Sequence, residues 1–199
     1  MNPERGKFIV LYGPNNLGKS TQVEILANAL EERGIKVETI KYPIYDLKPT
    51  GPLINAVLRE GEKMDELEVQ RIYAQNKFDY QPTLKTILKS GRWMLAEDYR
   101  GTGVAWGLVR GVPLKELEAL NKGLIREDLA ILLYGERFRE GIEGNHRNEA
   151  NDEIWDRAQM IHLCLADRYG WRKVYASRPE EEVHKDIFEI VKDQLLIPA

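Results

Sequence analysis

A run of nine residues near the N-terminus has the pattern that binds nucleotide phosphates. Residues 13–21 read GPNNLGKST and fill the motif G-x-x-x-x-G-K-[ST] without a gap. In this motif the backbone N–H groups surround a phosphate, Lys19 reaches the β and γ phosphates, and Ser20 coordinates Mg²⁺. We therefore predict that the chain binds a nucleoside triphosphate, with phosphate contacts from Gly13, Asn16, Gly18, Lys19, Ser20 and Thr21.

The elements around this motif predict how the loop is held in place. Apolar runs predict strands at 7–12, 36–42, 93–97, 129–134 and 173–176, and helical spacing predicts helices at 20–30, 49–60, 65–89, 152–169 and 179–195. Strands that alternate with helices predict an α/β fold with a doubly wound, mostly parallel, five-stranded sheet in one domain over residues 1–199. Ligands bind such sheets beyond the carboxyl ends of the strands, so the loop and Glu97 are expected to meet there.

The composition excludes several classes of function. The chain of 199 residues carries 29 Lys and Arg against 32 Asp and Glu, a formal net charge of −3. The chain has no overall excess of basic residues that would attract nucleic acid or a membrane surface, so neither is expected as a partner. No apolar run has the length of a membrane span, and no signal-peptide core is present, which predicts the cytoplasm. The single cysteine, Cys164, is expected to be a buried thiol.

A second informative stretch follows the third predicted strand. Residues 97–106 read EDYRGTGVAW and resemble the D-R-Y-x-x-S-G-V-A-[YF] segment of thymidylate kinases, with Thr-Gly-Val-Ala intact. Tyr42-Pro43 with residues 51–54 resembles the family's F-P…I-G-x-x-I segment, and residues 72–77 resemble its L-F-x-A-N-R helix. Residues 177–184 resemble the adenine-side loop and final helix. The resemblance covers nearly the whole chain and implies the P-loop fold of nucleoside monophosphate kinases.

This resemblance implies phosphoryl transfer from MgATP to dTMP, which yields dTDP for pyrimidine deoxynucleotide synthesis. The glycine loop, Lys19 and Ser20 would hold ATP and Mg²⁺, and Glu97 occupies the position of the family's Asp. That carboxylate would hold the water shell of the metal or orient the acceptor phosphate. The family's dimerisation through helices implies a homodimer. The acceptor nucleotide is expected at Asn15, Tyr42, Tyr73, Lys77, Arg100, Thr102 and Trp106.

The acceptor side departs from the family pattern. Asp98 stands where the family has Arg, and Arg100 is expected to take over its role. Lys77 replaces a helix arginine, which exchanges a bidentate fork for a point charge. Ile44 stands near the position where an arginine or glutamate usually follows F-P, and Asn15 replaces the Asp that contacts the sugar 3′-hydroxyl. The predicted clamp on the acceptor phosphate is thus thinner than the family pattern.

Base recognition has two readings. Tyr73 sits where the family stacks an aromatic ring on thymine, Trp106 would wall the pocket, and Thr102 could hydrogen-bond the pyrimidine edge. Gly107 stands where the family often has Gln, which leaves the base preference open. The two aromatic residues could equally be core packing, since aromatic side chains on helices usually are.

Residues 135–150 look like the family's lid. Their glycines allow hinge motion, and their three arginines could reach the phosphates on closure. Asn16 is not an arginine, so a catalytic arginine would come from this segment. Arg147 matches the family's E-R-[YF]-E arginine best. Arg139 is a second catalytic candidate, and with Ala176 and Ser177 it would also contact adenine. His146 is expected at the lid surface. The alternative is a solvated loop of mixed charge.

Three other functions stay open at this point. A deoxynucleoside kinase would use Glu97 as a base toward a sugar hydroxyl. A kinase for another pyrimidine monophosphate, such as dUMP, would share the same phosphate loop. A nucleotide-binding protein without turnover would explain the departures at Asp98, Lys77 and Ile44. Intact Lys19, Ser20, Glu97 and an arginine-bearing lid favour the kinase that acts on dTMP.

Overall fold

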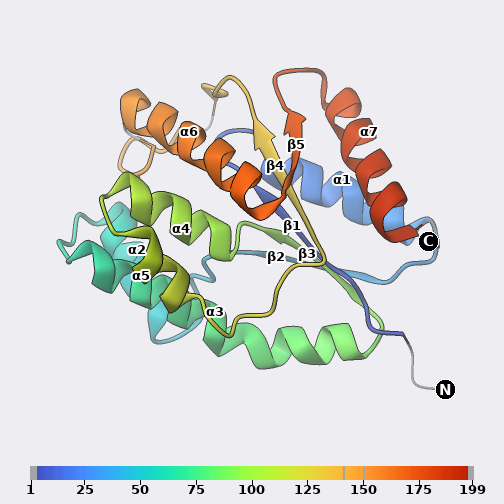
Figure 1. Ribbon diagram of the computed structural model, residues 1–199, viewed down its shortest axis with the longest axis horizontal. Coiled ribbons are helices and arrows are strands. Elements are labelled where there is room, and N and C mark those ends of the chain that lie inside the picture. The colour runs from blue at the N-terminus through green and yellow to red at the C-terminus, as the bar shows by residue number, and fades with distance from the viewer. Residues whose placement is uncertain (1–3, 141, 150, 197–199) are drawn as a thin grey trace.

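The computed structural model describes residues 4–140, 142–149 and 151–196, and these fold around one parallel sheet (Figure 1). The strand order is β2–β3–β1–β4–β5, with every neighbouring pair parallel. The predicted α/β fold with a doubly wound sheet is thereby confirmed. The strands are β1 (Phe8–Tyr12), β2 (Val37–Lys41), β3 (Trp93–Glu97), β4 (Leu129–Tyr134) and β5 (Arg172–Tyr175). The helices are α1 (Lys19–Glu31), α2 (Thr50–Arg59), α3 (Glu66–Lys89), α4 (Arg100–Val109), α5 (Leu114–Leu120), α6 (Asp152–Tyr169) and α7 (Glu180–Val191), which continues into a π-helical turn, η1 (Lys192–Leu196).

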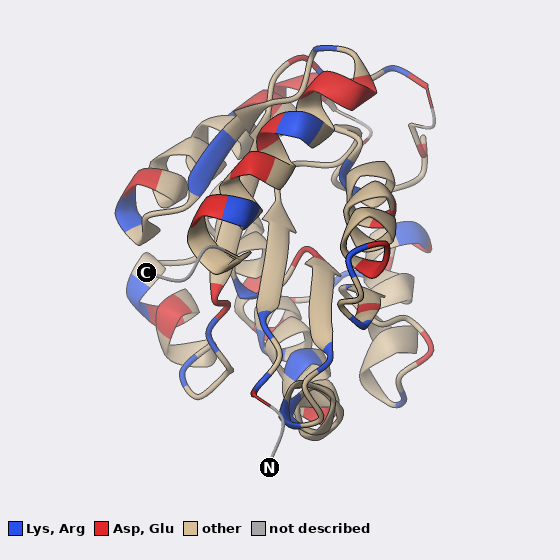
Figure 2. Ribbon diagram, turned by 90° about the vertical axis from the view of Figure 1, so that its right-hand side faces the viewer, with Lys and Arg blue, Asp and Glu red and all other residues tan. Residues whose placement is uncertain are grey.

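The two faces of the sheet bury different sets of helices. Along β1, Ile9 and Leu11 pack with residues of α1 and α7, whereas Phe8 and Val10 pack with residues of α3, α4, α5 and α6. This division follows from the two-residue period of a strand. The central strands β1 and β4 contain no charged residue, and the charged residues lie mainly on helices and loops (Figure 2). Such fully apolar strands are typical of a parallel sheet covered on both faces.

Two short helices, α4 and α5, were not predicted from the sequence. The glycines of α4 weaken its intrinsic helix propensity, so local sequence gives little signal for a helix there. The packing of α4 explains why glycine is needed at two of these positions, Gly101 and Gly107. A Cβ atom added at Gly101 would lie 2.5 Å from the ring of Trp171, and one added at Gly107 would lie 2.4 Å from the side chain of Leu117. Close approach to these neighbours therefore outweighs propensity in α4.

Helix α6 corrects the expectation for Cys164. The buried positions of α6 are Trp155, Ala158, His162, Leu165 and Ala166, which define the face turned to the core. Cys164 lies outside that face, and its side chain is exposed. Within the described residues, no helix is long and apolar enough to cross a membrane.

Candidate active site

The phosphate loop connects β1 to α1 at the carboxyl edge of the sheet. Its glycines are needed for conformation and for space: Gly13 and Gly18 have positive φ angles of 143° and 74°. A Cβ atom at Gly13 would lie 2.5 Å from the carbonyl oxygen of Leu133 in β4. The loop can therefore pass close to the neighbouring strand and turn its backbone into the start of α1, the geometry that favours an anion at a helix N-terminus.

Lys19 points back across the loop that it follows. Its side chain is only 3% exposed, and its ammonium donates to the carbonyl oxygens of Gly13 at 2.8 Å and Pro14 at 2.9 Å. The same ammonium lies 3.7 Å from Oδ2 of Asp98. Asp98 has a positive φ of 62°, an uncommon conformation for a residue with a side chain. This backbone turn brings the carboxylate of Asp98 to the phosphate loop.

Ser20, Lys41 and Glu97 form a polar cluster beside Lys19. The hydroxyl of Ser20 donates to Oε2 of Glu97 at 2.5 Å, and the ammonium of Lys41 lies 2.9 Å from Oε1. Burial acts to raise the pKa of Glu97, but the charges of Lys19 and Lys41 and the Ser20 hydrogen bond outweigh it, so the pKa is lowered. The group is therefore held as a carboxylate at neutral pH.

A divalent cation with a nucleotide fits this cluster. Mg²⁺ is usually held by one or two carboxylates, a hydroxyl and substrate phosphates, without an all-protein cage. The Ser20 hydroxyl and the Glu97 carboxylate supply that incomplete set of ligands. Accordingly, the described part of the chain has no group of three or more acidic, His or Cys side chains that would hold a metal by itself.

A cavity opens from this cluster toward α2, α3 and α4. It holds about 100 Å³ and is walled on the lid side by Glu143, His146, Asn148 and Glu149. Six of the seven residues predicted to bind the acceptor nucleotide line it together: Asn15, Tyr42, Tyr73, Lys77, Thr102 and Trp106. Glu97 and Asp98 lie at the same cavity. The structure thus brings together residues that are up to 134 positions apart in the chain, from Asn15 to Glu149.

Lys77 and Asp98 are two of the buried charged side chains that line this cavity. Burial lowers the pKa of Lys77 to about 7, with the carboxylate of Asp98 acting against that shift. Burial also raises the pKa of Asp98 to about 6, against the nearby charge of Lys19 and a 2.7 Å hydrogen bond from the Thr102 hydroxyl. Lys77 donates to the carbonyl oxygen of Tyr73 at 2.8 Å. Both side chains therefore titrate close to neutral pH.

The segment 135–149, apart from residue 141, packs over the phosphate loop and the cavity. Glu149 accepts a 2.6 Å hydrogen bond from the side-chain amide of Asn15. The backbone N–H of Phe138 donates to the carbonyl oxygen of Asn16 at 2.9 Å. His146 is buried and lines the cavity, which corrects the expectation of a surface residue, because the segment folds inward over the loop.

Comparison with known proteins decides the family. The family model described as thymidylate kinase matches residues 11–187. The chain is 31% identical to the probable thymidylate kinase of Pyrococcus abyssi over 204 residues, covering 96% of this chain and 98% of that protein. It is 28% identical to the human thymidylate kinase over 201 residues, covering 98% and 94%. The chain belongs to the thymidylate kinase family.

The fold comparison agrees with this assignment. The structure of thymidylate kinase from Candida albicans superposes with a TM-score of 0.87 at 21% identity, covering 95% of this chain and 92% of that one. The family model and the relatives confirm the sequence prediction of family, enzyme class and function: the protein is a thymidylate kinase-like, ATP-dependent nucleoside monophosphate kinase.

One predicted acceptor residue of this kinase lies elsewhere. Arg100 does not line the acceptor cavity; its guanidinium donates to Glu127 from Nε at 2.8 Å and from Nη2 at 3.3 Å. Arg100 begins α4, and Thr102, Gly103 and Trp106 occupy the face of that helix turned to the cavity. The helical rotation between positions 100 and 102 therefore turns Arg100 away from the site that Asp98 faces.

The kinase carries two cavity cations that sequence reasoning missed. Arg59, the last residue of α2, lies 4.7 Å over the ring of Tyr45 and pairs with Glu143 through Nε at 2.7 Å and Nη2 at 3.1 Å. Lys41, which ends β2, lies 3.4 Å from the Ser20 hydroxyl as well as beside Glu97. Lys41 had a detectable signal, since it is the last residue but one of a strand predicted to end at the ligand edge. Arg59 had none, because its position depends on the packing of α2.

The three arginines of the lid segment occupy different places. Arg137 is 4% exposed and donates from Nη2 to Oδ1 of Asn16 at 3.2 Å and to the carbonyl oxygen of Glu149 at 2.7 Å. Arg139 is largely exposed and pairs with Asp152 at 2.7 Å. The side chain of Arg147 pairs with Glu66 at the start of α3, and its N–H donates to Leu58 of α2. The phosphate loop is therefore contacted by Arg137 and not by Arg147.

The predicted adenine side lies at the ends of β4 and β5. The Ser177 hydroxyl accepts from the N–H of Glu136 at 2.6 Å, and buried Ala176 donates its N–H to Tyr134 at 2.8 Å. Phe138, which sequence reasoning did not single out, is 42% exposed, and a Cβ atom added at Gly18 would lie 3.4 Å from its ring. Thr21 is exposed in the first turn of α1.

Proposed function

We propose that this kinase transfers the γ-phosphoryl group of ATP to dTMP at the Lys19, Ser20 and Glu97 cluster, with Mg²⁺ as the metal. The observation that carries the proposal is the opening of the acceptor cavity directly beside this cluster. Phosphoryl transfer of this kind depends on positioning and charge neutralisation, and it needs no proton abstracted from an acceptor phosphate. Lys19 would neutralise charge on the transferred group, and Glu97 and Ser20 would hold the metal, which draws charge from the phosphate oxygens.

We propose Lys41, Arg59 and Lys77 as the cations that hold the acceptor nucleotide. They line the cavity from β2, α2 and α3, whereas Asp98 occupies the position of the family's arginine. Tyr73 and Trp106 would flank the base, and Asn15 with Glu149 would lie toward the sugar. The predicted lid, residues 135–150, would close over the site, because contacts of residues 138, 147 and 149 join the phosphate loop to α2.

Replacing Arg59 tests this clamp. We expect Arg59→Ala to raise the KM for dTMP by roughly tenfold to a hundredfold, because a charge-assisted hydrogen bond contributes about 1.5–3 kcal/mol. The KM for ATP should change little. Steady-state kinetics with Arg71→Ala as the control, an arginine that pairs with Glu68 on the surface of α3, checks the result. An unchanged KM for dTMP would exclude Arg59 from the clamp.

The acidity of Lys77 predicts a pH dependence. With its pKa near 7, the side chain is cationic below pH 7 and neutral above it, while Asp98 is ionised above about pH 6. If the acceptor needs the cation, its apparent KM rises about tenfold per pH unit above pH 7. Lys77→Arg keeps the charge at all these pH values and should remove that rise. If the KM rises equally in both proteins, the rise comes from titration of the substrate and not of Lys77.

The experiment that tests the whole function is an assay of ADP release with MgATP and a panel of acceptors. The panel contains dTMP, dUMP, dCMP, dGMP, UMP and thymidine. Turnover on dTMP supports the proposal, and turnover on thymidine would make Glu97 a base toward a sugar hydroxyl. Silence on every acceptor, with ATP still bound, would mean a nucleotide-binding protein without turnover.

We also propose that the protein is a cytoplasmic homodimer. Family resemblance supports the dimer, and Leu53 of α2 and Met160 of α6 are large apolar side chains that are exposed in the single chain. Light scattering at micromolar concentration should give twice the 23.0 kDa mass of the chain.

A further inference from the structure

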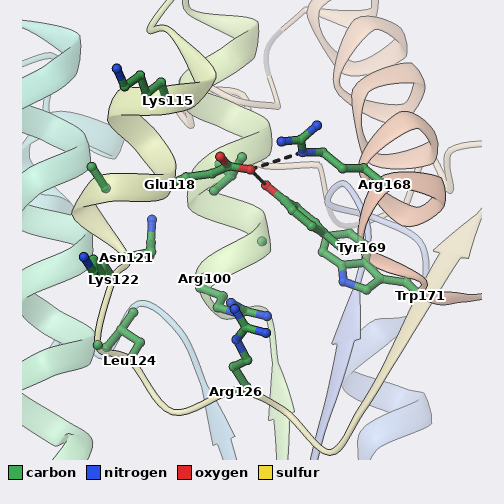
Figure 3. A pocket seen from close by; sticks show the side chains of 14 residues that line it. Arg100, Lys115, Glu118, Asn121, Lys122, Leu124, Arg126, Arg168, Tyr169 and Trp171 are labelled. Atoms are coloured by element: carbon green, nitrogen blue, oxygen red, sulfur yellow. Dashed lines mark hydrogen bonds and ion pairs between the residues drawn. The ribbon is translucent and has the colours of Figure 1, made fainter.

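A second and larger cavity lies behind the acceptor site, between α4, α5 and the end of α6 (Figure 3). It holds about 690 Å³, within the range of roughly 300–1,000 Å³ that is usual for small-molecule sites. No residue that lines it also lines the acceptor cavity. Helix α4 divides the two, because Gly101 and Val104 face this cavity while Thr102 and Trp106 face the acceptor cavity. The two cavities are therefore separate sites in the fold.

The charge of this cavity is strongly positive. One carboxylate, that of Glu118, lines it, against five cationic side chains from three parts of the chain. The chain as a whole has more acidic than basic residues, so this excess is local. The cations are Arg100, Lys115, Lys122, Arg126 and Arg168.

Two carboxylates pair with cations of this cavity: Glu118, which lines the cavity, and Glu127, which does not. Glu118 accepts from Nε of Arg168 at 3.1 Å and from the hydroxyl of Tyr169 at 2.8 Å, as Figure 3 shows. Glu127 accepts from Nε and Nη2 of Arg100, and no hydrogen bond or ion pair uses Nη1 of Arg100 within the described chain. Over the same residues, Arg126 and the two lysines have no carboxylate within 4.0 Å, so their charges are available to a ligand.

The shape and chemistry of the walls narrow the ligand further. Arg100 and Arg126 lie toward one end of the cavity in Figure 3, and Tyr169 projects from α6 toward Glu118. Apolar side chains, Val104, Leu124 and Trp171, form part of the same lining. Helices close the cavity on several sides, which suits a small molecule better than a polymer. Guanidinium groups favour phosphate, because two N–H groups can meet two phosphate oxygens.

We propose that this cavity is a second binding site, for a small organic phosphate of nucleotide size. Arg100 and Arg126 bind the phosphate group, with Lys122 at the rim, and the apolar wall contacts the carbon skeleton of the ligand. The site does not take part in phosphoryl transfer, so the proposal stands independently of the acceptor that the kinase uses.

Amide NMR of the full-length kinase tests the site, because it separates this cavity from the phosphate loop. The probes are inorganic pyrophosphate and AMP, each titrated into the nucleotide-free protein. We expect saturable shifts for residues 100, 101 and 104, for 121–126 and for 168–171, distinct from those of residues 13–21. AMP should bind this cavity more tightly than pyrophosphate does, because only AMP can contact the apolar wall.

The double variant Lys122→Glu, Arg126→Glu should weaken binding at the cavity at least tenfold while the shifts of residues 13–21 and the turnover with ATP stay unchanged. The matched control is Lys85→Glu, Lys89→Glu, which makes the same charge change at exposed positions of α3. If both double variants weaken binding equally, the loss comes from the change in net charge and not from the cavity, and the proposal is overturned. Shifts confined to residues 13–21 would also overturn it, and pyrophosphate binding as tightly as AMP would overturn the organic part.

Discussion

Lys19→Ala is expected to lower kcat by roughly a thousandfold or more, the scale of removing a main electrostatic contact to a transition state. The ammonium of Lys19 is bound by two loop carbonyl oxygens and lies beside Asp98, so it is fixed where the β and γ phosphates of ATP would arrive. In the variant, no cation from the loop would neutralise the charge that develops on the transferred group. Steady-state turnover with saturating MgATP and dTMP measures the loss.

Folding must be separated from chemistry in this test. Lys19 is buried, and its removal also relieves the desolvation of a charge, so the variant should retain its thermal unfolding midpoint within a few degrees. Lys36→Ala serves as the control, because Lys36 is an exposed lysine just before β2. Near-normal turnover of Lys19→Ala would contradict the proposed mechanism, whichever acceptor the kinase uses.

The sequence predicted the parts of the fold that depend on local pattern. The strands end within one or two residues of their predicted positions, because each is an apolar run between turn signals. Residues 13–18 form the predicted loop, and Lys19 begins α1, since the motif itself specifies the backbone. Helix α4 was missed, because its glycines are explained by contacts with Trp171 and Leu117 that are distant in sequence.

The acceptor site could be predicted only in part. Residues of the resemblance that lie on strands and long helices, such as Tyr73 and Lys77, line the cavity as predicted. Arg100 does not line the cavity. Each step along a helix turns the side chain by about 100°, and Arg100 lies two steps before Thr102, which faces the cavity. Arg59 was missed because its place in the cavity depends on how α2 packs against the lid, which no local pattern records. The sequence therefore predicted fewer cations around the acceptor phosphate than the cavity contains.

Two arginines of the lid segment, Arg137 and Arg147, are candidates for a catalytic role. A match to the family motif favours Arg147, but its side chain pairs with Glu66, whereas Arg137 contacts Asn16 of the phosphate loop. We therefore expect Arg137→Ala to lower kcat by about 10²–10⁴, near the lower part of the range for arginines that stabilise phosphoryl transfer. Arg147→Ala should lower it less than tenfold. The side-by-side comparison of kcat at saturating MgATP and dTMP decides between the two.

A structural role for Arg137 must be distinguished from a catalytic one, because its guanidinium also joins the lid to Asp152 and Glu149. Asp152→Asn removes one of these contacts but leaves Arg137 and its charge in place, so it should retain most of the turnover. Arg137→Lys keeps a charge and should recover part of kcat without restoring the bidentate geometry. If Arg137→Ala and Asp152→Asn lose the same activity, the arginine only holds the lid. If Arg147→Ala shows the larger loss, the lid moves on nucleotide binding so that Arg147 reaches the phosphates.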